Sequence, residues 1–153
     1  MITAVILTGC SSTPVRPAPE ADAIVVQDAW VKAADHGMTA AFGRLSNSSA
    51  ADVRIISATT TASNRVELHE VVPVGGTMTM RPKDGGIVVP AHAEVELTPG
   101  GDHLMLMELT GPLVAGTDIE MVATLEDGST FPIAAQVRDF SGADEHYQPG
   151  AHD

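Results

Sequence analysis

Apolar and polar residues alternate along the chain between residues 24 and 138. Alternation with a period of two places successive side chains on opposite faces of an extended chain, so it is typical of β-strands rather than helices. The pattern predicts ten strands, over residues 24–32, 39–45, 53–58, 65–72, 77–81, 87–89, 93–97, 104–109, 119–125 and 130–138. No stretch combines the period of an amphipathic helix with a capping residue at its start. We therefore expect an all-β protein.

Turn-forming residues separate the predicted strands. The Gly-Gly pair at 75–76 and the Asp-Gly pair at 127–128 are typical of tight connections between strands. Many short strands about ten residues apart favour an antiparallel β-sandwich or a small barrel. We assign residues 24–140 to this single domain. Residues 141–153 are polar and acidic, and we expect them to form a flexible tail that hangs free of the domain.

Composition and charge exclude several classes of function. The chain has 153 residues, with 8 Lys and Arg against 20 Asp and Glu, so its formal net charge is −12. Nucleic acids and anionic membrane surfaces bind clusters of basic residues, so neither is expected as a partner. One cysteine cannot form an intrachain disulfide, a cysteine-based zinc site or an iron–sulfur cluster. A hydrophobic share of 44% is too high for a disordered acidic chain, so we expect a folded domain.

The first ten residues carry features of an export signal. Residues 4–7 are apolar, and a run this short does not span a bilayer, which needs about 20 residues. Leu7-Thr8-Gly9-Cys10 resembles the lipobox of bacterial lipoproteins, in which the signal is cut before the cysteine and that thiol is lipidated. We therefore predict a signal-peptide remnant over residues 1–9, a Ser/Pro-rich tether over residues 10–23 and a lipid anchor on Cys10. The expected location is the cell envelope outside the cytoplasm, and the alternative is a frayed terminus with a chance cysteine.

Methionine and histidine gather in two of the predicted strand regions. Two methionine pairs have a spacing of two residues, which places each pair on one face of its strand. The pairs are Met78 with Met80 and Met105 with Met107. If the hairpin turn is centred between residues 74 and 75, His69 stands opposite Met80, where cross-strand Cβ atoms lie about 5 Å apart. Because His103 shares a face with Met105, we expect two imidazoles and two or three thioethers to converge from three strands.

Such a set of ligands has a definite preference among metals. Thioether sulfur is soft and neutral, so it favours Cu(I) over Zn²⁺, Ca²⁺ or Mg²⁺, and imidazole completes a Cu(I) shell. A blue-copper electron-transfer site is excluded, because it needs a cysteine thiolate and the one cysteine is assigned to the lipobox. Methionine is also a common core filler, and a histidine in a strand is often a surface or core residue. The spacing alone therefore leaves a metal site and a plain hydrophobic core both open.

A longer motif in the same region resembles the periplasmic copper chaperone family called PCuAC. The family has a His-x10-Met segment, then Arg-Pro, then a Pro-Gly-Gly-x-His-x-Met-x-Met strand. Here these are His69 and Met80, then Arg81-Pro82, then Pro99-Gly100-Gly101-Asp102-His103-Leu104-Met105-Leu106-Met107. The likeness extends upstream to Asp28-Ala29-Trp30 and downstream to Val137-Arg138, so it covers most of residues 24–138.

The resemblance implies both a fold and a function. It implies a cupredoxin-like, Greek-key β-sandwich that binds Cu(I) through His69, Met80, His103 and Met105, with Met78 and Met107 as secondary candidates. It also implies copper delivery outside the cytoplasm, to a copper-accepting protein such as a cytochrome c oxidase subunit or another copper chaperone. Some family members take up additional copper through His-rich tails, so Cu(II) binding by His146 and His152 of the tail is a further hypothesis.

Two other classes of function stay open beside the chaperone. One is a copper-buffering lipoprotein without a dedicated acceptor, and the other is a cell-surface β-sandwich interaction module whose methionines are core residues. An enzyme is not expected, because the sequence has no serine elbow, catalytic cysteine or phosphate-binding glycine loop. The acids of the strands, Glu67 among them, are expected to lie on solvated outward faces.

Overall fold

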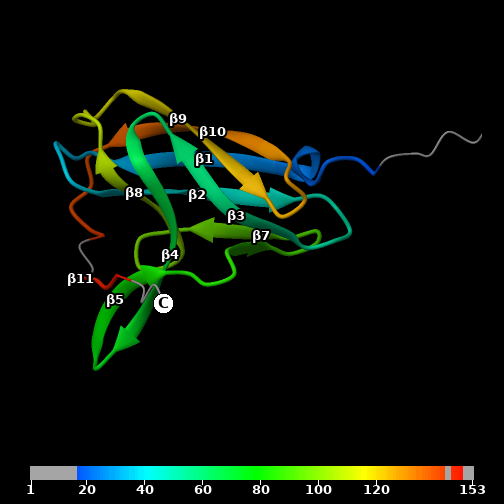
Figure 1. Cartoon of the computed structure of the whole chain (residues 1–153), viewed down its shortest axis with the longest axis horizontal. Helices are drawn as coiled ribbons and strands as arrows, with labels where there is room; N and C mark the ends of the chain where they lie inside the picture. Colours follow the sequence, from blue (N-terminus) through cyan, green and yellow to red (C-terminus); the bar gives the residue numbers. More distant parts are fainter. Residues whose placement is uncertain (1–16, 144–145, 150–153) are drawn as a thin grey trace, which may run out of the picture.

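A computed structural model describes residues 17–143 and 146–149, and these residues form almost entirely β-structure (Figure 1). A short 3-10 helix, η1 (Glu20–Ala23), precedes the strands. The strands are β1 (Ile24–Lys32), β2 (Thr39–Asn47), β3 (Val53–Thr60), β4 (Ser63–Val74), β5 (Thr77–Pro82), β6 (Ile87–Val89), β7 (Glu94–Leu97), β8 (His103–Leu109), β9 (Asp118–Leu125), β10 (Thr130–Arg138) and β11 (His146–Tyr147). Within the described residues no helix is long and apolar enough to cross a membrane.

All ten predicted strands are present, and most extend one or two residues beyond the predicted ends. The sequence did not predict η1 or β11. Residues 20–23 were assigned to the tether, but they pack at the end of the sandwich, where the backbone N–H of Ala21 donates to the Ser129 hydroxyl. The folded domain therefore begins before residue 24.

The strands form one continuous sheet that folds over into the two layers of a sandwich. Its order is β11-β5-β4-β8-β2-β1-β10-β9-β3-β6, with β7 paired to β2. Figure 1 shows β1, β2, β9 and β10 side by side, with the β4–β5 hairpin projecting from the domain. Most pairings are antiparallel, as predicted, but β1 with β10 and β11 with β5 are parallel. These exceptions arise because distant segments, rather than consecutive hairpins, bring the two pairs together.

Strand β8 is buried on both of its faces, and this places the candidate site. Its first five residues, from His103 to Met107, are all buried. Leu104 and Leu106 face the inside of the sandwich, where they join the inner core. The inner core also contains Val31, Leu45, Ile55, Leu68, Ile87, Met121, Leu125, Phe131 and Val137. His103, Met105 and Met107 face the opposite way, because successive residues of a strand alternate between its faces.

The β4–β5 hairpin has a different register from the predicted one. Gly75 and Gly76 have φ values of +57° and +85°, which suit a two-residue turn that only glycine adopts easily. The turn centre therefore lies between residues 75 and 76, and His69 pairs with Pro82 rather than with Met80. Met80 pairs instead with Val71. The shift is two residues, so Met80 stays on the same face as His69 and becomes its diagonal neighbour.

Candidate metal centre

A second group of buried side chains lies on the outer face of the sheet, and we call it the outer-face cluster. It consists of Ala40, Phe42, Met80, Met105 and Met107, together with the rings of His69 and His103. The four predicted primary ligands are all in this cluster and come from three strands, β4, β5 and β8. His69 and His103 are direct cross-strand partners, with ring centroids 5.4 Å apart. The structure thus brings together the side chains that the sequence singled out.

Hydrogen bonding orients the His69 ring and leaves one of its nitrogens as an acceptor. The Nε2 atom lies 2.7 Å from the Glu67 carboxylate, which only accepts, so Nε2 carries the hydrogen and donates it. The lone pair is therefore on Nδ1, which is buried and has no hydrogen-bond partner within the described part of the chain. Burial lowers the pKa of His69, against the opposing effect of Glu67, and so favours the neutral, metal-binding form.

The His103 ring is oriented by the turn before it. Its Nδ1 lies 2.9 Å from the carbonyl oxygen of Gly101, which can only accept, so Nδ1 donates. The lone pair of His103 is then on Nε2. A histidine that donates one ring N–H to a carbonyl or carboxylate presents the other nitrogen in a fixed direction, as in most protein metal sites. Both histidines have this arrangement.

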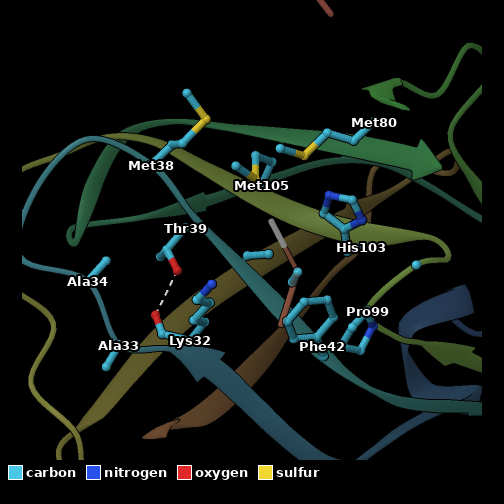
Figure 2. Close-up of a pocket in the computed structure, with 13 residues that line it drawn as sticks. Lys32, Ala33, Ala34, Met38, Thr39, Phe42, Met80, Pro99, His103 and Met105 are labelled. Atoms are coloured by element: carbon cyan, nitrogen blue, oxygen red, sulfur yellow. Dashed lines mark hydrogen bonds between the residues drawn. The ribbon is translucent and has the colours of Figure 1, made fainter. Parts of the chain in front are cut away.

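A pocket of about 310 Å³ opens onto the cluster. Figure 2 shows Met80, Met105, His103 and Phe42 around it, with Met38 at the rim. Met38 is 41% exposed, whereas Met80 and Met105 are only 7% and 3% exposed. The pocket therefore connects solvent to two buried thioethers and one imidazole. His69 does not line it and is fully buried.

The two secondary candidates lie in different surroundings. Met107 is buried in the outer-face cluster, one step along β8 from Met105 on the same face. Met78 lies near the tip of the projecting hairpin and is 48% exposed. Burial thus groups Met107, but not Met78, with the predicted ligands.

The remaining predicted residues lie away from the cluster or outside the described residues. His36 and His92, two histidines outside the predicted set, are exposed at a bend and a turn between strands. His146 is exposed on β11, where it pairs with Thr79. Cys10 and His152 lie outside the described residues.

Two residues of the site were missed by sequence reasoning. Glu67 was expected on a solvated outward face, but its side chain is only 15% exposed and bonds to His69. Glu67 lies two residues before His69, and side chains two apart in a strand share a face. This spacing could have placed Glu67 beside His69. Tyr147 is the second, because its ring stacks on His69 with centroids 5.5 Å apart and planes 4° from parallel. No pattern in the sequence indicates this contact.

The described part of the tail does not hang free. Tyr147 lies in β11, which pairs in parallel with β5, and the Gln148 N–H donates to the Met80 carbonyl oxygen. Ala143 packs against the outer-face cluster. The outer face of the sheet is apolar at this point, and Ala143 and Tyr147 of the tail pack on it, which contributes to the burial of the site.

The solved structures that this chain resembles include two copper-bound domains. The "Copper-bound PCuAC domain from PmoF2" has a TM-score of 0.64 at 20% identity, covering 77% of this chain and 94% of that one. The "Solution structure of apo-DR1885 from Deinococcus radiodurans" has a TM-score of 0.60 at 27% identity, covering 92% of this chain and 96% of that one. The "CuI-DR1885" structure from the same organism has a TM-score of 0.59 at 26% identity, covering 80% and 84% of the two chains. These likenesses confirm the predicted β-sandwich class.

Sequence relatives identify the family. A "Putative lipoprotein Lxx21020" of Leifsonia xyli subsp. xyli is 43% identical over 146 residues, covering 93% of this chain and 88% of its own length. The profile of the family described as "Putative lipoprotein LpqE-like" matches residues 24–137. The match is therefore to the LpqE-like profile, while the PCuAC likeness holds at the level of structure. The chain belongs to the LpqE-like family.

Proposed function

We propose that this protein binds Cu(I) outside the cytoplasm and hands it to an acceptor as a metallochaperone. The observation that carries the proposal is the donor set of the outer-face cluster. His69 and His103 each hold one ring nitrogen as a lone-pair donor, and the thioethers of Met80 and Met105 lie in the same buried cluster. We propose these four residues as the ligands, with Met107 as an additional sulfur beside them.

The chemistry of this donor set favours Cu(I). All four side chains are soft or borderline and neutral, so they suit a monovalent soft cation better than a hard divalent one. Neutral thioether and imidazole ligands leave the bound ion exchangeable, since no ligand must be reprotonated on release. The pocket leads from solvent to Met80, Met105 and His103, so an acceptor's ligands have a route to the metal.

The relatives support both the metal and the location. The PmoF2 domain is described as copper-bound and the DR1885 domain as bound to Cu(I). The family and the relative from Leifsonia xyli both carry the description "Putative lipoprotein", which supports the predicted anchor on Cys10 and a place at the outer side of a membrane. We propose a cytochrome c oxidase subunit, or another copper chaperone that serves the oxidase, as the acceptor. Nothing in this role requires catalysis.

A competition titration tests copper binding. Cu(I) is titrated anaerobically into the protein beside a Cu(I) chelator, using wild type, His103→Ala and the matched control His92→Ala. Wild type and the control should take copper from the chelator at one equivalent, and His103→Ala should lose at least about tenfold in affinity, which is about 1.4 kcal/mol. Circular dichroism checks that the variants are folded. Equally weak binding by wild type and His103→Ala contradicts the proposal.

A deletion strain separates delivery from buffering. If the protein delivers copper, its loss should lower cytochrome c oxidase activity under copper limitation, while tolerance to excess copper is unchanged. Added copper should restore the activity by mass action. Sensitivity to copper without a loss of oxidase activity would favour the buffering lipoprotein instead.

A further inference from the structure

The C-terminal segment, of which residues 141–143 and 146–149 are described, is attached to the domain on both sides of positions 144 and 145. The Lys32 ammonium donates to the Gly142 carbonyl oxygen at 2.6 Å. At its far end β11 pairs with β5. The segment is thus tied to β1 on one side of the cluster and to β5 on the other.

Tyr147 is the residue of this segment that meets a proposed copper ligand. Its ring is stacked parallel to the His69 imidazole with centroids 5.5 Å apart, and its hydroxyl lies 3.3 Å from Oε2 of Glu67. That same carboxylate oxygen accepts the hydrogen bond from His69 Nε2. A carboxylate cannot donate, so the tyrosine hydroxyl is the donor.

These contacts fix the His69 ring in three ways. The Glu67 carboxylate accepts the Nε2 hydrogen, and the Tyr147 ring restricts rotation of the imidazole. The Tyr147 hydroxyl in turn holds the Glu67 carboxylate in place. Arg65 adds an ion pair to the other oxygen of Glu67 at 3.1 Å. Partners of this kind around a metal-binding histidine set its orientation and basicity, and their loss typically lowers metal affinity about 10–100-fold.

We propose that Tyr147 is a positioning residue of the copper site, and that the C-terminal segment holds it there as a strap across His69. The inference rests on the proposed Cu(I) site and adds the order in which an acceptor replaces its ligands. The strap covers the His69 side, whereas the pocket reaches His103, Met80 and Met105. An acceptor therefore replaces those three ligands first, and the strapped His69 is the last to release the ion.

Two substitutions separate the stacking contact from the hydrogen bond. Tyr147→Phe keeps the ring and removes the hydroxyl, while Tyr147→Leu removes both. Phe140→Leu is the matched control, because it changes an aromatic side chain that precedes the strap and contacts Trp30, not His69. Tyr147 is the only tyrosine of the chain, so its replacement also marks its own signals in NMR spectra.

The first measurement needs no copper. In the NMR spectrum of the metal-free protein, the ring protons of His69 should be shifted upfield by the stacked Tyr147 ring. The shift should survive in Tyr147→Phe and Phe140→Leu and disappear in Tyr147→Leu. An unshifted His69 in the wild type overturns the proposal, because the strap then does not cover the ring.

The second measurement is the rate at which a chelator removes Cu(I) from the loaded protein. Tyr147→Leu should release copper about tenfold faster than wild type, Tyr147→Phe should fall between them, and Phe140→Leu should stay near wild type. Unfolding midpoints in urea confirm that the variants are equally folded. If wild type shows the NMR shift but binds no Cu(I), the proposed function is overturned, and with it the role of Tyr147 in a copper site. Tight binding by wild type with an unchanged release rate in Tyr147→Leu overturns the strap alone.

Discussion

Strand β8 contributes to two buried regions that differ in kind. Leu104 and Leu106 point into the inner core, among aliphatic and aromatic side chains. Met105 and Met107 point into the outer-face cluster, beside His103. All five residues are nearly inaccessible to solvent, at 6% exposure or less. Burial therefore does not distinguish a core from a site, and the distinction lies in which atoms are buried.

The outer-face cluster contains a buried nitrogen whose lone pair accepts no hydrogen bond from the described residues. A buried polar atom without a partner typically costs about 1–3 kcal/mol of stability. Nδ1 of His69 is such an atom within the described residues, while the side chains that β8 turns to the inner core, Leu104 and Leu106, are apolar. A fold that retains this cost on one face of a strand, and avoids it on the other, indicates a function on the first face.

The largest expected effect comes from the inner core. Leu106→Ala removes a fully buried side chain and leaves a cavity, so the free energy of unfolding of the metal-free protein should fall by about 2–5 kcal/mol. Urea unfolding measures it. Cu(I) affinity of the folded fraction should stay within about threefold of wild type, since inner and outer side chains of β8 face opposite ways. A loss of affinity as large as that of His103→Ala would show that the two regions are not separate.

The next prediction makes the same substitution, methionine to leucine, once in each of the two buried regions. Met105 and Met121 are 3% and 1% exposed, the first in the outer-face cluster and the second in the inner core. Replacing either by leucine conserves volume and should change stability by less than about 1.5 kcal/mol. Only Met105→Leu removes a proposed copper ligand, so it alone should lower Cu(I) affinity, by about 10–100-fold or 1.4–2.7 kcal/mol.

Chelator competition on the two leucine variants decides between the alternatives that the spacing left open. Equal copper affinities for Met105→Leu and Met121→Leu would mean that Met105 is a core filler. A larger loss of stability in Met105→Leu than in Met121→Leu would mean that the outer-face cluster is itself a core that needs the shape of methionine.

A smaller effect is expected from the acid behind His69. Glu67→Gln keeps an oxygen that accepts from Nε2 but removes the charge that makes the imidazole a better donor, so Cu(I) affinity should fall by about tenfold. The control is Glu70→Gln on the opposite face of β4, where Glu70 pairs with Arg81 and Lys83. The control should bind copper like wild type. Equal affinities in both variants would mean that Glu67 has no part in positioning His69.

The sequence was enough to predict the strands, the face of the strand on which each side chain lies and the types of candidate ligand, because these depend on local periodicity. The pairing of His69 with Met80 was not, since it needed the turn centre, and the two left-handed glycines moved that centre by one residue. The error was harmless to the site because an even shift preserves the face. Glu67 was predictable from the same parity and was misassigned because charged residues are more often exposed.

The strap was beyond local reasoning for a different reason. Tyr147 and His69 are 78 positions apart in the sequence, and β11 is only two residues long. A two-residue strand gives no period, and the polar composition around it is typical of a free tail. Its docking depends on the apolar outer face that the rest of the fold exposes, so it follows only from the tertiary structure.

The smallest expected effect lies at the far end of the inner core and depends on pH. There Asp127 accepts hydrogen bonds from the backbone N–H of Glu20 and from Ser129, and these lower the pKa of its carboxyl below 3.8. The lower pKa means that the folded state binds this proton less readily than the unfolded state. Asp127 therefore contributes stability above pH 3.8, and the contribution is lost as the pH falls through the folded-state pKa.

Asp127→Asn removes this titration, so the variant should be slightly less stable than wild type near neutral pH, and the difference should shrink on acidification below about pH 4. Urea unfolding at several pH values measures it. Asp127 accepts a hydrogen bond from η1, whose Ala21 packs on the inner core and not on the outer-face cluster. Cu(I) affinity at neutral pH should therefore be unchanged. A stability difference that grows on acidification would mean that the bonds from Glu20 and Ser129 do not favour the charged carboxylate. A change in copper affinity would show that the end of the inner core is coupled to the outer-face cluster after all.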